Sequence, residues 1–152
     1  MSNRKEEFFL LIKNAVFAAY LAFLSYGLFF ADGMGRTERQ IKSYNLVPFT
    51  EIKRYISYAD TIGLPIVFFN LLGNVLAFVP FGFLLPAMWP KGEKHHPIAA
   101  ILVTLSFSVV VEILQFATKS GIADIDDVIL NTAGGFLGYI LYLVIEAAHK
   151  KK

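Results

Sequence analysis

The sequence predicts an all-α integral membrane protein, a bundle of about four transmembrane helices. Hydrophobic residues make up 56% of the 152 residues and charged residues only 17%, and the mean hydropathy is +0.56. A soluble domain of this size could not cover so much apolar surface. Four apolar stretches each approach the roughly 20 residues with which a helix crosses a bilayer. We interpret residues 1–152 as a single membrane domain.

The first predicted span covers residues 8–30. Lys13 lies near enough to one end for its amine to reach the lipid headgroups. The apolar stretch is too long for the core of a signal peptide, and no small-residue cleavage site follows it, so we expect a retained helix.

The second predicted span, residues 66–89, is interrupted by polar and helix-breaking residues, namely Asn70, Asn74, Pro80, Gly82 and Pro86. Membrane helices tolerate such interruptions where neighbouring helices satisfy the freed backbone groups. We therefore expect this helix to pack inside the bundle, with a kink or a break.

The third and fourth predicted spans cover residues 97–116 and 128–147. Proline suits the first turn of a helix, and Pro97 opens the third span. In the fourth span, Gly134 and Gly138 form a small-xxx-small pattern, which predicts close packing against another helix.

The connection between the first two spans, residues 31–65, is too polar to cross a membrane. Within it Ile52, Tyr55 and Ile56 recur at helical spacing beside Lys53 and Arg54. This pattern fits a short helix at the membrane interface, and a solvated loop remains an equal alternative.

Basic residues favour an orientation with both termini in the cytoplasm. The short basic connection 91–96 and the terminal lysines then lie inside, while the outer basic residues fall mostly in one longer loop, where they count less. These residues form no nucleic-acid-binding stripe, so nucleic acid is not an expected partner. The chain has no cysteine, which excludes disulfides and a cysteine nucleophile.

Nine polar residues are expected at one depth, near the outer membrane face. With four spans, the start of the second, the end of the third and the start of the fourth all meet there. Several are spaced by three or four residues and so share a helix face. The predicted cluster, for binding or another function, comprises Asn70, Asn74, Glu112, Gln115, Lys119, Asp124, Asp126, Asp127 and Asn131.

The chemistry of this cluster stays open on the residues alone. An ionisable residue in a membrane span is a functional candidate, and Glu112 is the strongest one here. Among the three aspartates, at least one is expected to cap the fourth helix, and the asparagines could join helices by hydrogen bonds. The run from Asp124 to Asp127 lacks the glycine and distal glutamate of an EF-hand, and the histidines fall on the opposite side, so we predict no metal site and identify no cofactor.

The ordered motifs resemble those of the VanZ-like family. They are Asn45-Leu-Val-Pro-Phe, Asn70-Leu-Leu-Gly-Asn, Phe78-Val-Pro-Phe-Gly, Glu112-Ile-Leu-Gln and Asp124-Ile-Asp-Asp-Val-Ile-Leu-Asn-Thr, and the match spans about residues 36–143. Where the family often has an arginine before the acidic motif, this chain has Lys119, which keeps the charge without bidentate geometry. The resemblance implies a multi-pass protein of the bacterial plasma membrane that is associated with antibiotic resistance, namely tolerance to the glycopeptide teicoplanin.

Three functions remain in competition. The first is a cell-envelope protein that binds an envelope lipid or glycan in an outer polar cavity and so modulates teicoplanin susceptibility. The second is a membrane enzyme that uses the carboxylates, or a divalent cation held by them, on a lipid-linked headgroup. The third is a small transporter or channel; four helices without a repeat suit alternating access poorly, and a homo-oligomer would overcome this.

Overall fold

Four long helices dominate the computed structural model, which describes residues 2–29, 44–89, 96–118 and 120–150. They are α1 (Ser2–Phe29), α4 (Leu64–Met88), α5 (Pro97–Thr118) and α6 (Ile125–Lys150). Each contains a stretch that is long and apolar enough to cross a membrane. The predicted all-α membrane bundle of four transmembrane helices is therefore confirmed.

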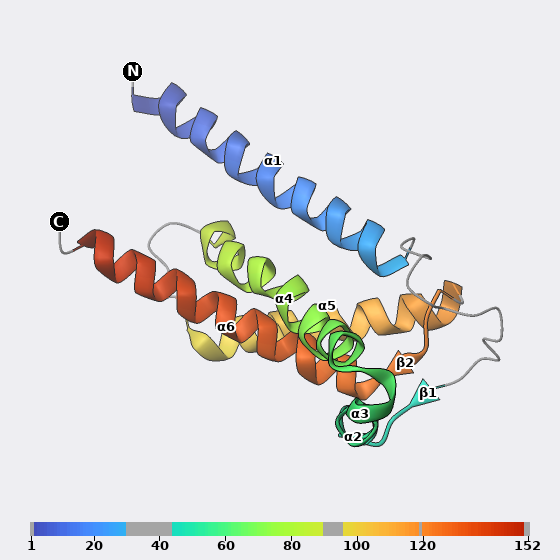
Figure 1. Cartoon of the computed structure of the whole chain (residues 1–152). Coiled ribbons are helices and arrows are strands. Elements are labelled where there is room, and N and C mark those ends of the chain that lie inside the picture. The colour runs from blue at the N-terminus through green and yellow to red at the C-terminus, as the bar shows by residue number, and fades with distance from the viewer. Residues whose placement is uncertain (1, 30–43, 90–95, 119, 151–152) are drawn as a thin grey trace.

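The helices alternate in direction along the bundle. The first turn of α1 and the last turn of α6 lie at the same end (Figure 1). We call the other end, where α5 runs into α6, the polar end. An even number of spans produces this arrangement, because each crossing reverses the side on which the chain emerges.

The tightest packing joins α4 to α6 through glycines. A Cβ atom added at Gly134 would lie 2.1 Å from the carbonyl oxygen of Val75, and one at Gly138 would lie 1.9 Å from that of Val79. From the other helix, a Cβ at Gly82 would lie 1.7 Å from the carbonyl oxygen of Gly135. The small residues thus let the two backbones touch, as the glycine pattern predicts.

The sequence predicts a kink or a break in α4; the helix is continuous through Pro80 and Pro86, so it has no break. It also begins two residues earlier than predicted, after Gly63, whose φ of 89° suits glycine. Pro80 itself is exposed, on the side of α4 away from the bundle core.

An aromatic core fills the middle of the bundle. It contains the buried side chains of Leu24, Phe78, Phe81, Leu85, Ala100 and Tyr139. Phe81 stacks on Phe107 of α5, with ring centroids 4.7 Å apart. Core packing therefore holds α4, α5 and α6 together, and α1 adds Leu24 to the core and packs against it with Phe17, Tyr20, Leu21 and Leu28.

Helix α1 lies along one side of the bundle (Figure 1), and most of its described side chains are exposed. Two polar contacts attach it to α4. The Tyr20 hydroxyl donates to the Ala77 carbonyl oxygen at 2.7 Å, and the Lys13 amine donates to the carbonyl oxygen of Ala87. Lys13, which the sequence predicts to lie near the membrane surface, thus makes a helix-to-helix contact.

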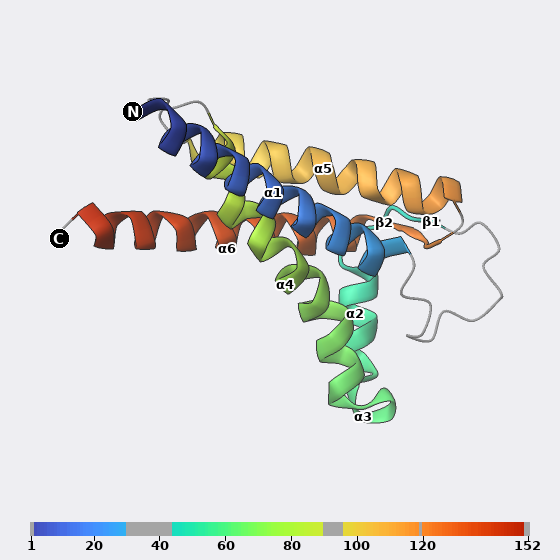
Figure 2. The ribbon, with the colours of Figure 1, turned by 90° about the horizontal axis from the view of Figure 1, so that it is seen from above.

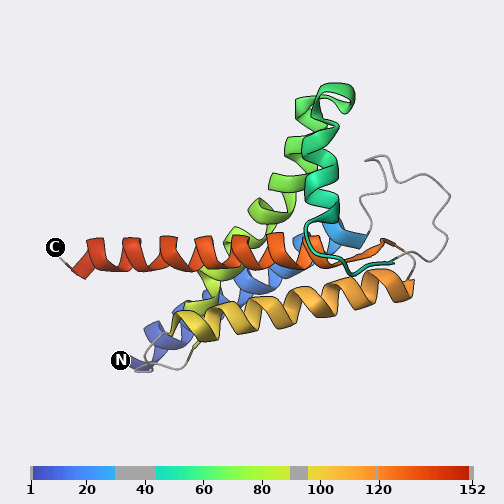
Figure 3. The same cartoon turned by 90° about the horizontal axis from the view of Figure 1, so that it is seen from below.

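Short elements close the polar end. Helix α2 (Thr50–Ser57) settles the choice between helix and loop, and α3 (Ala59–Ile62) follows it. Figures 2 and 3 show α2, α3 and the first part of α4 projecting to one side, across the direction of α5 and α6. Two-residue strands, β1 (Tyr44–Asn45) and β2 (Ala123–Asp124), pair in parallel, which the sequence did not predict.

Candidate functional site

Glu112 connects α5 to the start of α6. Its side chain is only 5% exposed, and its Oε2 atom accepts the backbone N–H of Asp124 at 3.0 Å. A buried carboxylate needs such donors, because burial removes most of the bulk water that would otherwise solvate its charge. Glu112 therefore fixes the position of strand β2 against α5.

Asp124 caps α6. Its Oδ1 atom accepts the backbone N–H of Asp126 at 2.9 Å, which is the contact that an N-cap residue makes with the second residue of its helix. The same oxygen accepts the side-chain amide of Asn45 at 2.9 Å. Burial raises the pKa of Asp124, and these hydrogen bonds oppose that shift. One aspartate of the three thus has the predicted capping role, and the cap explains why α6 begins at Ile125 and not at Val128.

Asp126 holds a different helix. Its side chain is 1% exposed and accepts backbone N–H groups from the first turn of α2 and the residue before it. The donors are Glu51 at 2.8 Å, Ile52 at 3.1 Å and Phe49. Phe49 has φ 65°, a left-handed conformation that is uncommon outside glycine. A sequence pattern could not reveal this cap, because its two sides lie about 75 residues apart.

Asn74 and Asp127 form a side-chain pair between α4 and α6. The Asn74 side-chain amide donates to Oδ1 of Asp127. Both residues are half-buried. The predicted positions on facing helices are therefore brought together at the polar end.

Asn131 and Gln115 form two further polar contacts. The Asn131 side-chain amide donates to the Ser108 hydroxyl at 2.9 Å, and Asn131 is 1% exposed. Gln115, 5% exposed, donates from its side chain to the carbonyl oxygen of Leu28 at 3.0 Å. Gln115 thus links α5 to the end of α1.

Two predicted residues do not join these contacts. Asn70 is exposed, and its side-chain amide donates to the carbonyl oxygen of Ile66 in its own helix. Lys119 lies outside the residues that the structure describes. Asn45 and Ser108 enter the network without having been predicted as site residues, although Asn45 opens one of the family motifs.

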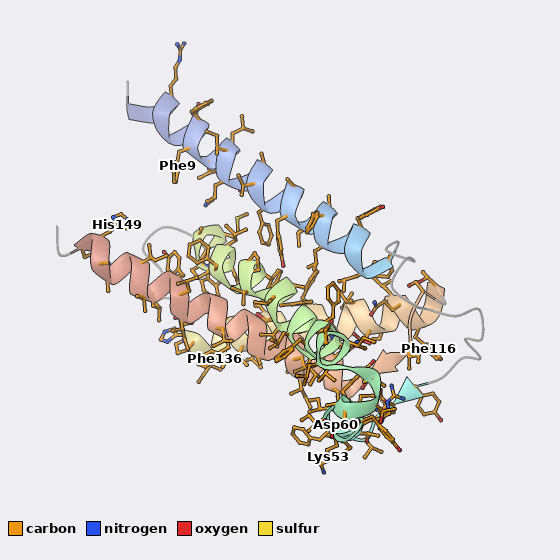
Figure 4. All side chains as sticks on the ribbon, in the orientation of Figure 1. Phe9, Lys53, Asp60, Phe116, Phe136 and His149 are labelled. Atoms are coloured by element: carbon orange, nitrogen blue, oxygen red, sulfur yellow. The ribbon has the colours of Figure 1, made fainter. Side chains whose placement is uncertain are left out.

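The polar end is rich in carboxylates. Glu51 pairs with Arg54 within α2 and lies near the aspartates. Burial is the largest cause of the raised pKa of Glu51. The charge of Arg54 lowers this pKa, and the charges of Asp124 and Asp126 raise it. Within the described residues, no three His, Cys, Asp or Glu side chains converge as metal ligands. His149 lies at the opposite end of the bundle, far from Lys53 and Asp60 of the polar end (Figure 4).

Comparison with known proteins identifies relatives of this chain. The family model described as VanZ/LLP1 matches residues 16–146. The protein named Protein VanZ from Enterococcus faecium is 38% identical over 101 residues, which is 66% of this chain and 53% of that protein. The chain therefore spans about half the length of the curated relative that it matches. No solved structure matches it.

Proposed function

We propose, because the chain belongs to the VanZ/LLP1 family as its motifs predicted, that it modulates teicoplanin susceptibility at the bacterial cell envelope. In this proposal both termini are cytoplasmic and the polar end faces outward. The polar end binds an envelope lipid or glycan there.

The concentration of carboxylates and side-chain amides at one end of a membrane bundle is the observation that supports a binding role. Glu112, Asp124, Asp126 and Asp127 gather there with Asn45 and Asn74, through hydrogen bonds that join α2, α4, α5 and α6. Ionised carboxylates accept hydrogen bonds, and amides both donate and accept them. Glycans and lipid headgroups present hydroxyls and amides, so this set of groups suits them.

Within this set, the Asn74–Asp127 pair is our candidate for ligand contact. Glu112, Asp124 and Asp126 accept backbone N–H groups and so build the local fold. The pair joins two side chains on facing helices, both half-buried, and each of its four side-chain heteroatoms can take part in more than one hydrogen bond. We assign ligand contact to the pair and a positioning role to the other three.

The test compares two asparagines one turn apart on α4. Cells expressing wild type, Asn74→Ala, Asn70→Ala or Asp127→Ala are compared for teicoplanin susceptibility at matched membrane abundance. We expect wild type and Asn70→Ala to raise tolerance equally, and Asn74→Ala and Asp127→Ala to lose most of the effect. If wild type confers no tolerance, or if Asn74→Ala retains it in full, the proposal is wrong.

Two further measurements separate binding from the enzymatic and transport alternatives. A change in the masses of envelope lipids that depends on the wild-type chain would indicate an enzyme. Ligand flux into proteoliposomes would indicate a transporter. The use of three of the four carboxylates as backbone acceptors favours binding over either, because those groups already have structural partners.

A further inference from the structure

A stripe of polar side chains runs along the buried face of α5. Thr104, Ser108, Glu112 and Gln115 are spaced by four, four and three residues, so they share one face of the helix. Thr104 and Ser108 are fully buried, and Glu112 and Gln115 are each 5% exposed. Mean hydropathy is highest in this helix among the four spans, so a polar buried face is unexpected there.

The facing helix α6 places two unpaired polar atoms at this depth. Oδ1 of Asn131 and Oγ1 of Thr132 are both buried and find no hydrogen-bond partner among the described groups. Asn131 faces the stripe directly, because its amide nitrogen donates to Ser108. A buried polar atom without a partner costs free energy, and a polar site of this kind is where proteins hold internal water.

The stripe has a polar end and an apolar end. Toward the polar end it reaches Glu112 and Gln115, beside strand β2. In the other direction the same face of α5 continues from Thr104 to Ala100, which is part of the aromatic core with Phe78 and Tyr139. Water could therefore enter from the polar end and would be stopped by the core.

We propose that water enters the bundle from the polar end, between α5 and α6, as far as Asn131 and Thr132. This water donates a hydrogen bond to the side-chain carbonyl oxygen of Asn131, Oδ1, and forms a hydrogen bond with the Thr132 hydroxyl. It also solvates the Glu112 carboxylate on its way. The inference concerns hydration alone and stands whether or not the polar end binds a ligand.

The absence of cysteine from the chain allows a direct test. Single cysteines replace Ser108 and Thr132, which face the proposed path, and Ser106, which is exposed on the lipid-facing side of α5. Thr118→Cys, exposed at the polar end of α5, reports which side of the membrane that end occupies. Ser106→Cys and Ser108→Cys form a matched pair, because they are the same change two residues apart.

The probe is Ag⁺, a small membrane-impermeant ion that binds thiolates. Sealed right-side-out vesicles and sealed inverted vesicles are each exposed to Ag⁺. The protein is then unfolded in detergent, and the thiols that have not reacted are tagged with a maleimide that shifts the protein on a gel. A thiol ionises in water and resists ionisation in lipid, and one pKa unit changes the thiolate fraction about tenfold. Insertion and abundance of each variant are measured in the same vesicles.

We expect Ser108→Cys and Thr132→Cys to react from the same side as Thr118→Cys and at least about tenfold faster than Ser106→Cys. Two positions on different helices keep the test informative if one variant fails to insert. The proposal would be overturned if the variants that insert normally, Ser108→Cys or Thr132→Cys, react no faster than Ser106→Cys. It would also be overturned if they react from the side opposite to Thr118→Cys.

Discussion

The carboxylate of Asp126 on α6 accepts the backbone N–H of Glu51 in the first turn of α2, at 2.8 Å. The first N–H groups of a helix have no partner within it, and a negative charge placed there also complements the helix dipole. Asp126 accepts three backbone N–H groups here, those of Phe49, Glu51 and Ile52. A single buried side chain therefore fastens the connection between the first two spans to the fourth.

Asp126→Asn should loosen α2 while leaving the four spans inserted. Both carboxylate oxygens of Asp126 act as acceptors, and asparagine would replace one of them with a donor that faces other donors. We expect the free energy of opening α2 locally to fall by about 1–3 kcal/mol, which is the cost of leaving such buried groups unpaired. Amide hydrogen exchange over residues 49–57 in nanodiscs measures it. Asp60→Asn, an exposed carboxylate on α3, is the control, and equal exchange in both variants would contradict this role.

Gly138→Ala should separate α4 from α6, whereas Gly73→Ala should not. A Cβ at position 138 would lie 1.9 Å from the Val79 carbonyl oxygen, and backbone cannot move aside as a side chain can. A Cβ at position 73 would meet nothing within 4 Å. We expect Gly138→Ala to lower the free energy of unfolding by about 1–3 kcal/mol or more through overpacking. Gly73→Ala should leave the free energy of unfolding unchanged or raise it, because alanine has the higher helix propensity. Thermal unfolding in detergent compares them; equal losses would show that the helices are not in contact here.

The sequence was a good guide to the spans and a partial guide to the site. Apolar length predicts the four helices, and spacing predicts that Asn74, Glu112 and Asp127 approach one another, because both signals are local. The cap of α2 by Asp126 and the pairing of β1 with β2 depend on contacts between distant segments. Spacing within one helix also could not show that Asn70 turns outward while Asn74 turns inward, since the tilt of α4 decides this.

Asp124 should make the stability of the fold depend on pH. Burial raises its folded-state pKa above the unfolded value, so between the two values the folded protein binds more protons than the unfolded one. Stability must then rise as pH falls through this interval and fall as pH rises. Asp124→Asn removes the titration and keeps an acceptor oxygen for the cap. Thermal unfolding measured from pH 7 to pH 4 should show the stability of wild type rising relative to that of the variant as pH falls. A fall in this relative stability would refute the effect of burial.

The placement of both termini at one end of the bundle predicts where single cysteines will react. Ser2→Cys and His149→Cys should be labelled by an impermeant maleimide from the same side, and Thr118→Cys from the other, since α5 ends at the polar end (Figure 1). If the termini are cytoplasmic, as the basic flanks favour, only Thr118→Cys reacts in intact cells and the other two react in inverted vesicles. The reverse pattern would place the carboxylates inside the cell and exclude direct contact with outer envelope glycans. Labelling of Ser2→Cys and His149→Cys from different sides would instead require an odd number of spans, and α1, which exposes most of its length, would be the helix that fails to cross.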